Sequence, residues 1–112
     1  MKRYGMVIGL HPDKVSEYRK LHAAVWQDVL KKITECRIQN YSIFLRTLDD
    51  GQPYLFSYFE YTGSDFGGDM ASMAADPVTQ QWWSVCMPCQ KPLENRNAGE
   101  WWAAMEEVFH LD

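Results

Sequence analysis

The longest amphipathic pattern in the chain runs from Val15 to about Glu35. On a helix with about 100° per residue its apolar side chains fall on one broad arc. His22 falls near the middle of this arc, where an aliphatic side chain would pack better. The pattern therefore predicts one long helix and leaves open whether His22 is a core residue or a functional one. The apolar positions of the arc are Val15, Tyr18, Leu21, Val25, Trp26, Val29, Leu30 and Ile33.

Strand patterns lie on both sides of this helix. Residues 3–10, RYGMVIGL, predict an apolar strand, and His11-Pro12-Asp13 then supplies a helix start with proline at the first helical position. Residues 38–47 and 54–61 alternate as strands do and are separated by the turn sequence DDGQP. We expect these two segments to form a hairpin. On residues 38–47 the alternation places Tyr41, Ile43 and Leu45 on one face.

The second half of the chain predicts two short helices, or one broken helix, and a final strand. Residues 69–75, DMASMAA, favour a helix, and a second helix follows with Asp76 as its N-cap and Pro77 at the next position. Residues 90–100 are polar and predict an exposed loop. The tail 101–112 ends in Val-Phe-His-Leu, which favours a last strand that pairs back into the sheet.

The element order is β-α-β-β-α-β, which predicts a single α+β domain over residues 1–112 with a ferredoxin-like antiparallel sheet. Helices would cover one face of this sheet. Residues 54–61 carry apolar side chains at both alternating sets of positions, so the second face also favours burial. A second copy of the sheet would cover it, which predicts a homodimer and a dimeric α+β barrel. The alternative is a monomer whose extra aromatic side chains line a pocket.

Composition narrows the class of partner. The chain has 112 residues, a net charge of −4 and a pI near 5.3, and it has no run of Lys or Arg. Nucleic acids and anionic membranes need a basic surface, so we expect neither as a partner, and a neutral or weakly charged small molecule fits better. The start of the chain is not typical of a signal peptide, and no segment has the roughly 18 apolar residues of a membrane helix. With three cysteines, an odd count, these features predict a cytoplasmic protein with free thiols.

Two aromatic clusters are candidates for a binding site. Tyr18, His22 and Trp26 have the spacing i, i+4 and i+8, which forms one stripe on a helix. A histidine there offers proton transfer near neutral pH, although a lone helical histidine is more often structural. Trp82 and Trp83 are adjacent, so on a helix they point about 100° apart. An indole matches the C–H face of a sugar, but two tryptophans filling a small core explain the pair equally well.

Other candidate chemistry is weakly supported. Cys86 and Cys89 have C-x-x-C spacing but follow a helix, whereas a redox motif favours a helix N-terminus, and no second pair of ligands completes a zinc site. Glu60, Glu106 and Glu107 are candidates to orient His22, but no spacing selects one of them. The chain has no nucleotide-binding glycine motif, nucleophile elbow or H-E-x-x-H. We therefore expect no metal and no large cofactor.

Four motifs in one order resemble the L-rhamnose mutarotase family. They are EYRKLHAAVW, NYSIFL, QQWW and the terminal MEEVFHLD, and together they cover nearly the whole chain. The resemblance implies a dimeric α+β barrel, no cofactor, and interconversion of the α and β anomers of a free 6-deoxy sugar. It makes His22 the proton donor and places Tyr18, Tyr41, Trp82 and Trp83 on the substrate. Trp26, from the helical stripe, is the sixth candidate site residue.

The chain departs from the family pattern at two places. Members often have a proline between the histidine and the tryptophan of the first motif, whereas HAAVW has none, so we expect the helix to stay intact. The segment YTGSDFGGDMASMAADPVTQ is longer than its counterpart in the family, and extra residues beside the pocket would affect which sugar fits. L-fucose is therefore the alternative to L-rhamnose.

Two other function classes stay open at this point. One is an oxygenase-like or haem-handling protein on the same barrel, with His22 as the axial ligand. The other is a sugar-binding module without catalysis.

Overall fold

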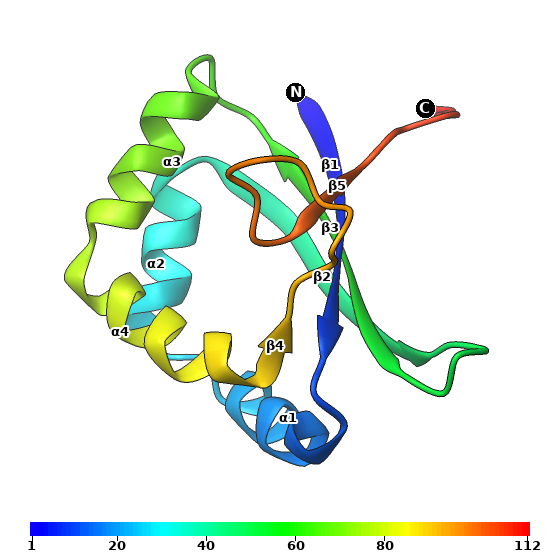
Figure 1. The fold of residues 1–112 in the computed structure, drawn as a ribbon. Helices are drawn as coiled ribbons and strands as arrows, with labels where there is room; N and C mark the ends of the chain where they lie inside the picture. The colour runs from blue at the N-terminus through cyan, green and yellow to red at the C-terminus, as the bar shows by residue number, and fades with distance from the viewer.

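The five strands form one antiparallel sheet in the computed structural model, which describes residues 1–112 (Figure 1). Its main strands follow the order β2-β3-β1, and β4 and β5 both pair with the remaining edge of β1. Together β4 and β5 form the last strand of a ferredoxin-like sheet, which the element order predicts, but this strand is split in two. The strands are β1 (Lys2–Leu10), β2 (Ile38–Thr47), β3 (Pro53–Tyr61), β4 (Gln90–Lys91) and β5 (Ala103–Met105).

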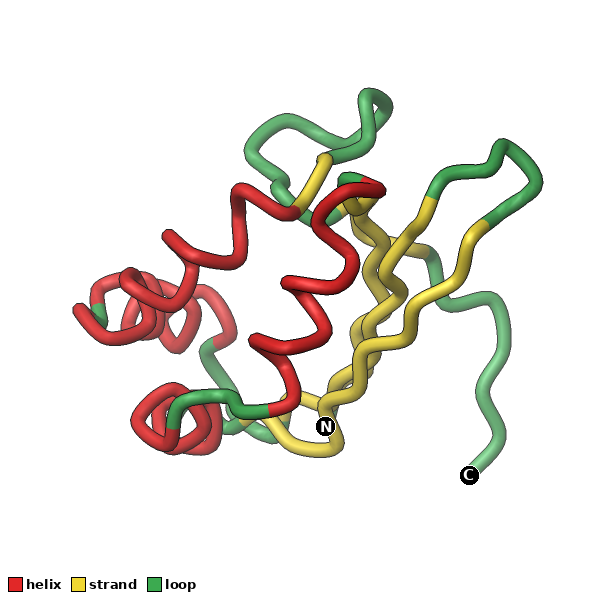
Figure 2. The backbone as a smooth tube through the Cα atoms, turned by 90° about the horizontal axis from the view of Figure 1, so that it is seen from below, coloured by secondary structure: helices red, strands yellow, loops and turns green.

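All helices lie on one side of this sheet, as Figure 1 and the view from below in Figure 2 show. None of them is long and apolar enough to span a lipid bilayer. The two-layer arrangement confirms the predicted α+β fold class. The α-helices are α1 (Val15–Ala23), α2 (Gln27–Glu35), α3 (Phe66–Ala75) and α4 (Pro77–Cys86), and the short 3-10 turns are η1 (Pro12–Lys14) and η2 (Met87–Cys89).

The start of α4 follows directly from its sequence. The Asp76 carboxylate accepts the Thr79 backbone N–H at 2.9 Å and the Thr79 hydroxyl at 2.8 Å, and Pro77 is the first helical residue. Asp65 caps α3 in the same way through the Gly68 N–H at 3.0 Å. A cap of this type stabilises a helix by about 1 kcal/mol. Both helices therefore begin at residues whose side chains satisfy free N–H groups.

The prediction of one intact helix from Val15 to Glu35 is wrong. α1 ends at Ala23, and Trp26 has extended backbone angles (φ −61°, ψ 137°) before α2 begins at Gln27. No proline or glycine lies in this segment, so local propensity does not cause the break. The break places the Trp26 ring edge-on against Trp82, with the ring centroids 5.2 Å apart. Tertiary packing between aromatic rings thus overrides the helical preference of HAAV.

Two predictions for the C-terminal quarter also need correction. Residue Gln90, expected in an exposed loop, is buried and begins β4, where Gly9 pairs with Lys91. The tail contributes only Ala103–Met105 to the sheet, and residues 106–112 run away from it (Figures 1 and 2). Three apolar tail residues have no covering partner within the chain, which explains why the apolar pattern did not produce a longer strand. They are Val108, Phe109 and Leu111, which are 86%, 79% and 79% exposed.

The side chains of β3 point alternately to a buried face of the sheet and to a partly exposed face. They alternate strictly between buried and half-buried, with Leu55, Ser57 and Phe59 beneath the helices. The helix-covered side contains two core clusters. One contains Ile8, Leu10, Tyr18, Val29, Leu55, Trp82, Cys86 and Cys89, and the other contains Cys36, Ile38, Phe59, Tyr61 and Met73.

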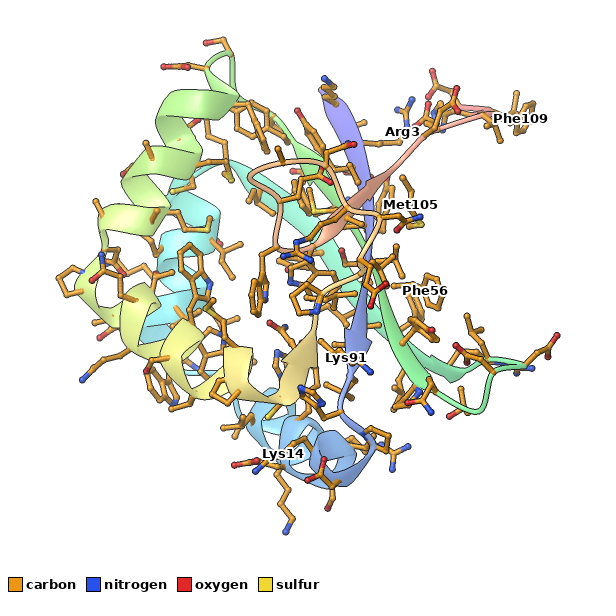
Figure 3. The ribbon with its side chains drawn as sticks, viewed as in Figure 1. Arg3, Lys14, Phe56, Lys91, Met105 and Phe109 are labelled. Carbon is orange, nitrogen blue, oxygen red and sulfur yellow. The ribbon has the colours of Figure 1, made fainter.

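The outer face of the sheet has no helix over it. Phe44 there is 61% exposed and Met105 is 42% exposed, and Tyr54, Phe56 and Tyr58 are half-buried. In Figure 3 the side chains of Phe56 and Met105 lie on the side of the sheet away from the helices. The second apolar face that the sequence of β3 predicts is therefore present in the fold.

Candidate functional site

Tyr18, His22 and Trp82 form an aromatic group between the helices and the sheet. Tyr18 and His22 stack with ring centroids 4.0 Å apart, and the His22 and Trp82 centroids are 5.2 Å apart. The first pair results from i, i+4 spacing on α1, as the sequence predicts. The second brings α4 against α1. Tyr18 and Trp82 are almost fully buried, whereas His22 is half-buried.

The His22 ring is fixed by one hydrogen bond. Its Nδ1 lies 3.1 Å from the carbonyl oxygen of Tyr18, and a carbonyl can only accept, so Nδ1 carries the proton and donates it. In the neutral ring Nε2 is then without a proton. Burial lowers the pKa of His22, and the bond to the Tyr18 carbonyl opposes this only in part. His22 is therefore neutral at pH 7, with Nε2 able to accept a proton.

The structure brings Trp26 to the same group by a route other than the predicted stripe. Trp26 precedes α2 rather than continuing α1, and its ring contacts Trp82, with centroids 5.2 Å apart. Tyr18 and Trp26, eight positions apart, therefore do not lie on one face of a single helix. Trp82 lies between the His22 and Trp26 rings, at 5.2 Å from each centroid.

Tyr41 reaches this region from the sheet. Its ring contacts the buried Phe59 ring, with centroids 5.4 Å apart. Burial of the hydroxyl raises the pKa of Tyr41 to about 12, although 42% of the residue's surface is exposed. The pKa depends on the surroundings of the hydroxyl, whereas the exposed fraction covers all atoms of the residue. The Tyr18 pKa is also raised, first by burial and to a smaller extent by the nearby Tyr41 phenol, while the Gln90 side chain opposes the shift.

Trp83 and the candidate carboxylates lie elsewhere. Trp83 is 37% exposed and contacts none of the aromatic rings of the site, so only the first tryptophan of the pair meets His22. Glu60 binds Gln39, Asn40 and Tyr58 on the outer side of the sheet. Glu107 pairs with Arg3 at 2.9 Å. No carboxylate bonds to the His22 ring, whose one hydrogen bond goes to the Tyr18 carbonyl.

Comparison with known proteins gives the family. A profile of the L-rhamnose mutarotase family matches residues 3–111. Proteins named L-rhamnose mutarotase from Oceanobacillus iheyensis and Lactiplantibacillus plantarum are each 32% identical over the full length of both chains. The one from Bacillus subtilis is 30% identical, again over both full chains. The chain belongs to the L-rhamnose mutarotase family. Members of this family are isomerases that act on carbohydrates.

Solved structures agree on the fold of this L-rhamnose mutarotase family member. A crystal structure of an L-rhamnose mutarotase from Formosa agariphila matches over the whole of both chains with a TM-score of 0.74 at 18% identity. Tetracenomycin F2 cyclase from Streptomyces glaucescens, a type-II polyketide cyclase, has a TM-score of 0.71 at 14% identity. At these identities the matches show the fold alone, which is the dimeric α+β barrel class that the sequence predicts.

Gln90 is a polar residue of the site that sequence reasoning missed. Its side chain is buried, and its Oε1 accepts the Trp101 indole N–H at 2.8 Å. This bond leaves the amide N–H groups of Gln90 for other partners, and the Gln90 side chain is close enough to the Tyr18 phenol to oppose the rise of its pKa. No motif marks Gln90 in the sequence, because its importance depends on the pairing of β4 with β1. In this member of the L-rhamnose mutarotase family, the loop after β4 is thus linked to Tyr18.

The three cysteines of this L-rhamnose mutarotase family member are unpaired and buried. Cys86 ends α4, where the sequence places it, and burial raises its pKa to about 12. The pKa of Cys89 is also raised, first by burial and then by the nearby Glu17 carboxylate. Both residues are therefore protonated thiols at neutral pH, the less nucleophilic form.

Proposed function

We propose that the protein interconverts the α and β anomers of L-rhamnose by opening and closing the sugar ring. The observation that carries the proposal is the His22 ring, held by its Nδ1–H to the Tyr18 carbonyl and neutral at pH 7, within an aromatic site. The chain also matches proteins named L-rhamnose mutarotase over its full length. We place the reaction at His22, with Tyr18, Tyr41, Trp82 and Trp26 as substrate contacts. Trp83 is left out, because its ring contacts none of the others.

Ring opening needs one proton acceptor and one proton donor. The anomeric hydroxyl loses its proton as the C1 carbonyl forms, and the C1–O5 bond breaks with its electron pair on O5, which takes up a proton. We assign the first transfer to Nε2 of His22, because this nitrogen is free to accept. A phenol with a raised pKa stays neutral and can donate to O5, which is the role we give Tyr18. Closure on the other face after rotation about C1–C2 reverses both transfers, and His22 is then the proton donor that the family resemblance implies.

Saturation-transfer NMR between the two anomeric protons tests this function. The exchange rate is measured for L-rhamnose and for L-fucose, each with and without protein. We expect the protein to accelerate exchange, and to do so most strongly for L-rhamnose. A preference for L-fucose would change the substrate but keep the reaction. Binding of sugar with exchange at the solvent rate would instead show a sugar-binding module and would contradict the proposal.

The proposal predicts a pH dependence that follows His22. Because its pKa is lowered by burial, the ring stays neutral until the pH falls below the ordinary value of about 6.5. We expect the protein-dependent exchange rate to be level near neutral pH and, below the His22 pKa, to fall about tenfold per pH unit. The solvent rate is subtracted at each pH. A rate that rises as the pH falls through this window would contradict His22 as the initial acceptor.

Stability should change in the same pH window. The neutral form of His22 is favoured in the folded protein, so the stabilisation is complete above the unfolded pKa of about 6.5 and is lost as pH falls toward the lower folded pKa. Urea unfolding at several pH values, compared with His22→Gln, isolates this contribution. The wild type should lose more stability than the variant between neutral and mildly acidic pH, and equal losses would contradict the burial effect.

We also propose that two copies pair through the uncovered face of the sheet. Phe44 and Met105 are exposed there, and the fold class is one in which two such sheets close a barrel. Sedimentation velocity should give a species of twice the 13.1 kDa chain mass. Phe44→Asp, which places a charge on this face, should shift the population to the monomer. A monomeric wild type at assay concentrations would contradict the pairing.

A further inference from the structure

The carboxylate of Glu60 is the centre of a hydrogen-bond cluster on the outer side of the sheet. Its Oε1 accepts the side-chain amides of Gln39 at 2.9 Å and Asn40 at 2.7 Å. Its Oε2 accepts the Tyr58 hydroxyl at 2.8 Å. These three bonds, first those from Gln39 and Asn40, lower the pKa of Glu60, so the group is ionised at neutral pH. Three donors on one carboxylate form a more specific arrangement than a solvated surface acid needs.

Two of the three donors belong to an irregular point of β2. Gln39 pairs with Glu60, but the next paired residue is Ser42, opposite Tyr58. Asn40 and Tyr41 together therefore face the single residue Phe59, which defines a β-bulge. Asn40 has a φ of 48°, in the left-handed region that asparagine tolerates better than most residues. The Glu60 carboxylate binds the side chain of the residue with this unusual backbone conformation.

The bulge decides on which side of the sheet Tyr41 lies. Side chains alternate along a strand, so with Ile38 buried under the helices an unbroken strand would turn residue 41 to the outer face. The extra residue in the bulge moves every later side chain of β2 to the opposite face, as a shift of the register by one residue would. Tyr41 consequently contacts the buried Phe59 ring and lies on the same side as Tyr18. Without the bulge the Tyr41 phenol would be on the face opposite to His22.

We propose that Glu60 is a positioning residue that acts through the bulge to hold Tyr41 on the substrate side of the sheet. Glu60 itself lies on the opposite side and touches no atom of the site. The inference deepens the proposed function, since it rests on the role given there to Tyr41. It assigns the Glu60 carboxylate to the geometry of the sheet rather than to proton transfer with His22.

Glu60→Ala tests the proposal with a structural and a kinetic measurement. The nuclear Overhauser contact between the Tyr41 and Phe59 rings should weaken or vanish. The kcat/KM for anomer exchange of L-rhamnose should fall on the order of tenfold, which is the effect of losing about one hydrogen bond to the substrate. Most of this change should be in KM. Glu60→Gln keeps acceptor capacity for the amides and should retain most of both signals. An unchanged ring contact in Glu60→Ala would overturn the proposal.

A control and a double variant separate positioning from a general loss of stability. Glu107→Ala removes a different carboxylate, an exposed one that binds Arg3 at 2.9 and 3.0 Å, and should leave the ring contact and KM unchanged. In a Tyr41→Phe background, Glu60→Ala should cause little further loss, because the group that it positions is already gone. Full additivity of the two losses would overturn the proposal.

A pair of substitutions at Asn40 tests the backbone directly and does not depend on Glu60→Ala being folded. Asn40→Gly keeps access to positive φ and should preserve the Tyr41–Phe59 contact, whereas Asn40→Val disfavours that conformation and should lose it. Equal behaviour of the two variants would overturn the role of the bulge. The ring contact is measured without substrate, so a wild type that fails to exchange anomers would refute the proposed function and still leave the positioning of Tyr41 measurable.

Discussion

His22→Ala is expected to lower the protein-dependent rate of anomer exchange by about 10²–10⁴-fold, which is the usual contribution of a positioned acid–base group. The reason is the loss of Nε2, the nitrogen that the Tyr18 carbonyl bond leaves free to accept a proton. Saturation transfer between the anomeric protons of L-rhamnose measures the effect. Because the reaction also proceeds in water, the total exchange rate in the presence of the variant should approach the solvent rate rather than zero.

The control for this variant is another histidine. His110 is in the tail, where its Nε2 pairs with Asp112 at 2.7 Å, far along the chain from the aromatic site. His110→Ala should keep the wild-type exchange rate. His22→Ala should keep a folded near-ultraviolet circular dichroism spectrum, because His22 is only half-buried. A folded His22→Ala protein with full activity would refute the proposed mechanism.

Trp82→Ala is expected to have the largest effect on stability, lowering the free energy of unfolding by about 3–5 kcal/mol. Trp82 is 6% exposed, belongs to the larger core cluster, and contacts both the His22 and the Trp26 rings. Its removal leaves a cavity that the surrounding helices can only partly close. Urea unfolding at pH 7 measures the change.

The adjacent tryptophan supplies the comparison for this measurement. Trp83 has the same side chain on the same helix but is 37% exposed. Trp83→Ala should therefore cost clearly less stability than Trp82→Ala. Equal costs, or a larger cost at Trp83, would contradict the placement of the two rings.

Features of the chain that depend on neighbouring residues were predictable from the sequence. The hairpin of β2 and β3 follows from alternation and the DDGQP turn, and α4 begins at its predicted cap, Asp76. The stacking of His22 on Tyr18 follows from i, i+4 spacing. Each of these requires only short-range geometry. The site residues that belong to a single element were therefore accessible to sequence reasoning.

Features that depend on distant contacts were not predictable. The break before Trp26 has no local signal, because it results from packing against Trp82 more than 50 positions later. The alternation along residues 38–47 correctly placed Tyr41 with Ile43 and Leu45, but it did not reveal the bulge that reverses the alternation before Tyr41. Gln90 became a site residue only through the pairing of β4. The short final strand likewise reflects the absence of a neighbour for the apolar tail within one chain.

The division of the last strand has a consequence for how this region can change over evolutionary time. β4 pairs with Gly9 and Leu10, and β5 pairs with Gly5, Met6 and Val7, so each half has its own register on β1. Residues 92–102 connect these two attachment points without setting either register. Insertions and deletions in this loop should therefore be tolerated by the sheet as long as the Trp101 indole still reaches the Gln90 side chain. Changes of chain length are therefore expected between these two attachment points rather than within β4 or β5.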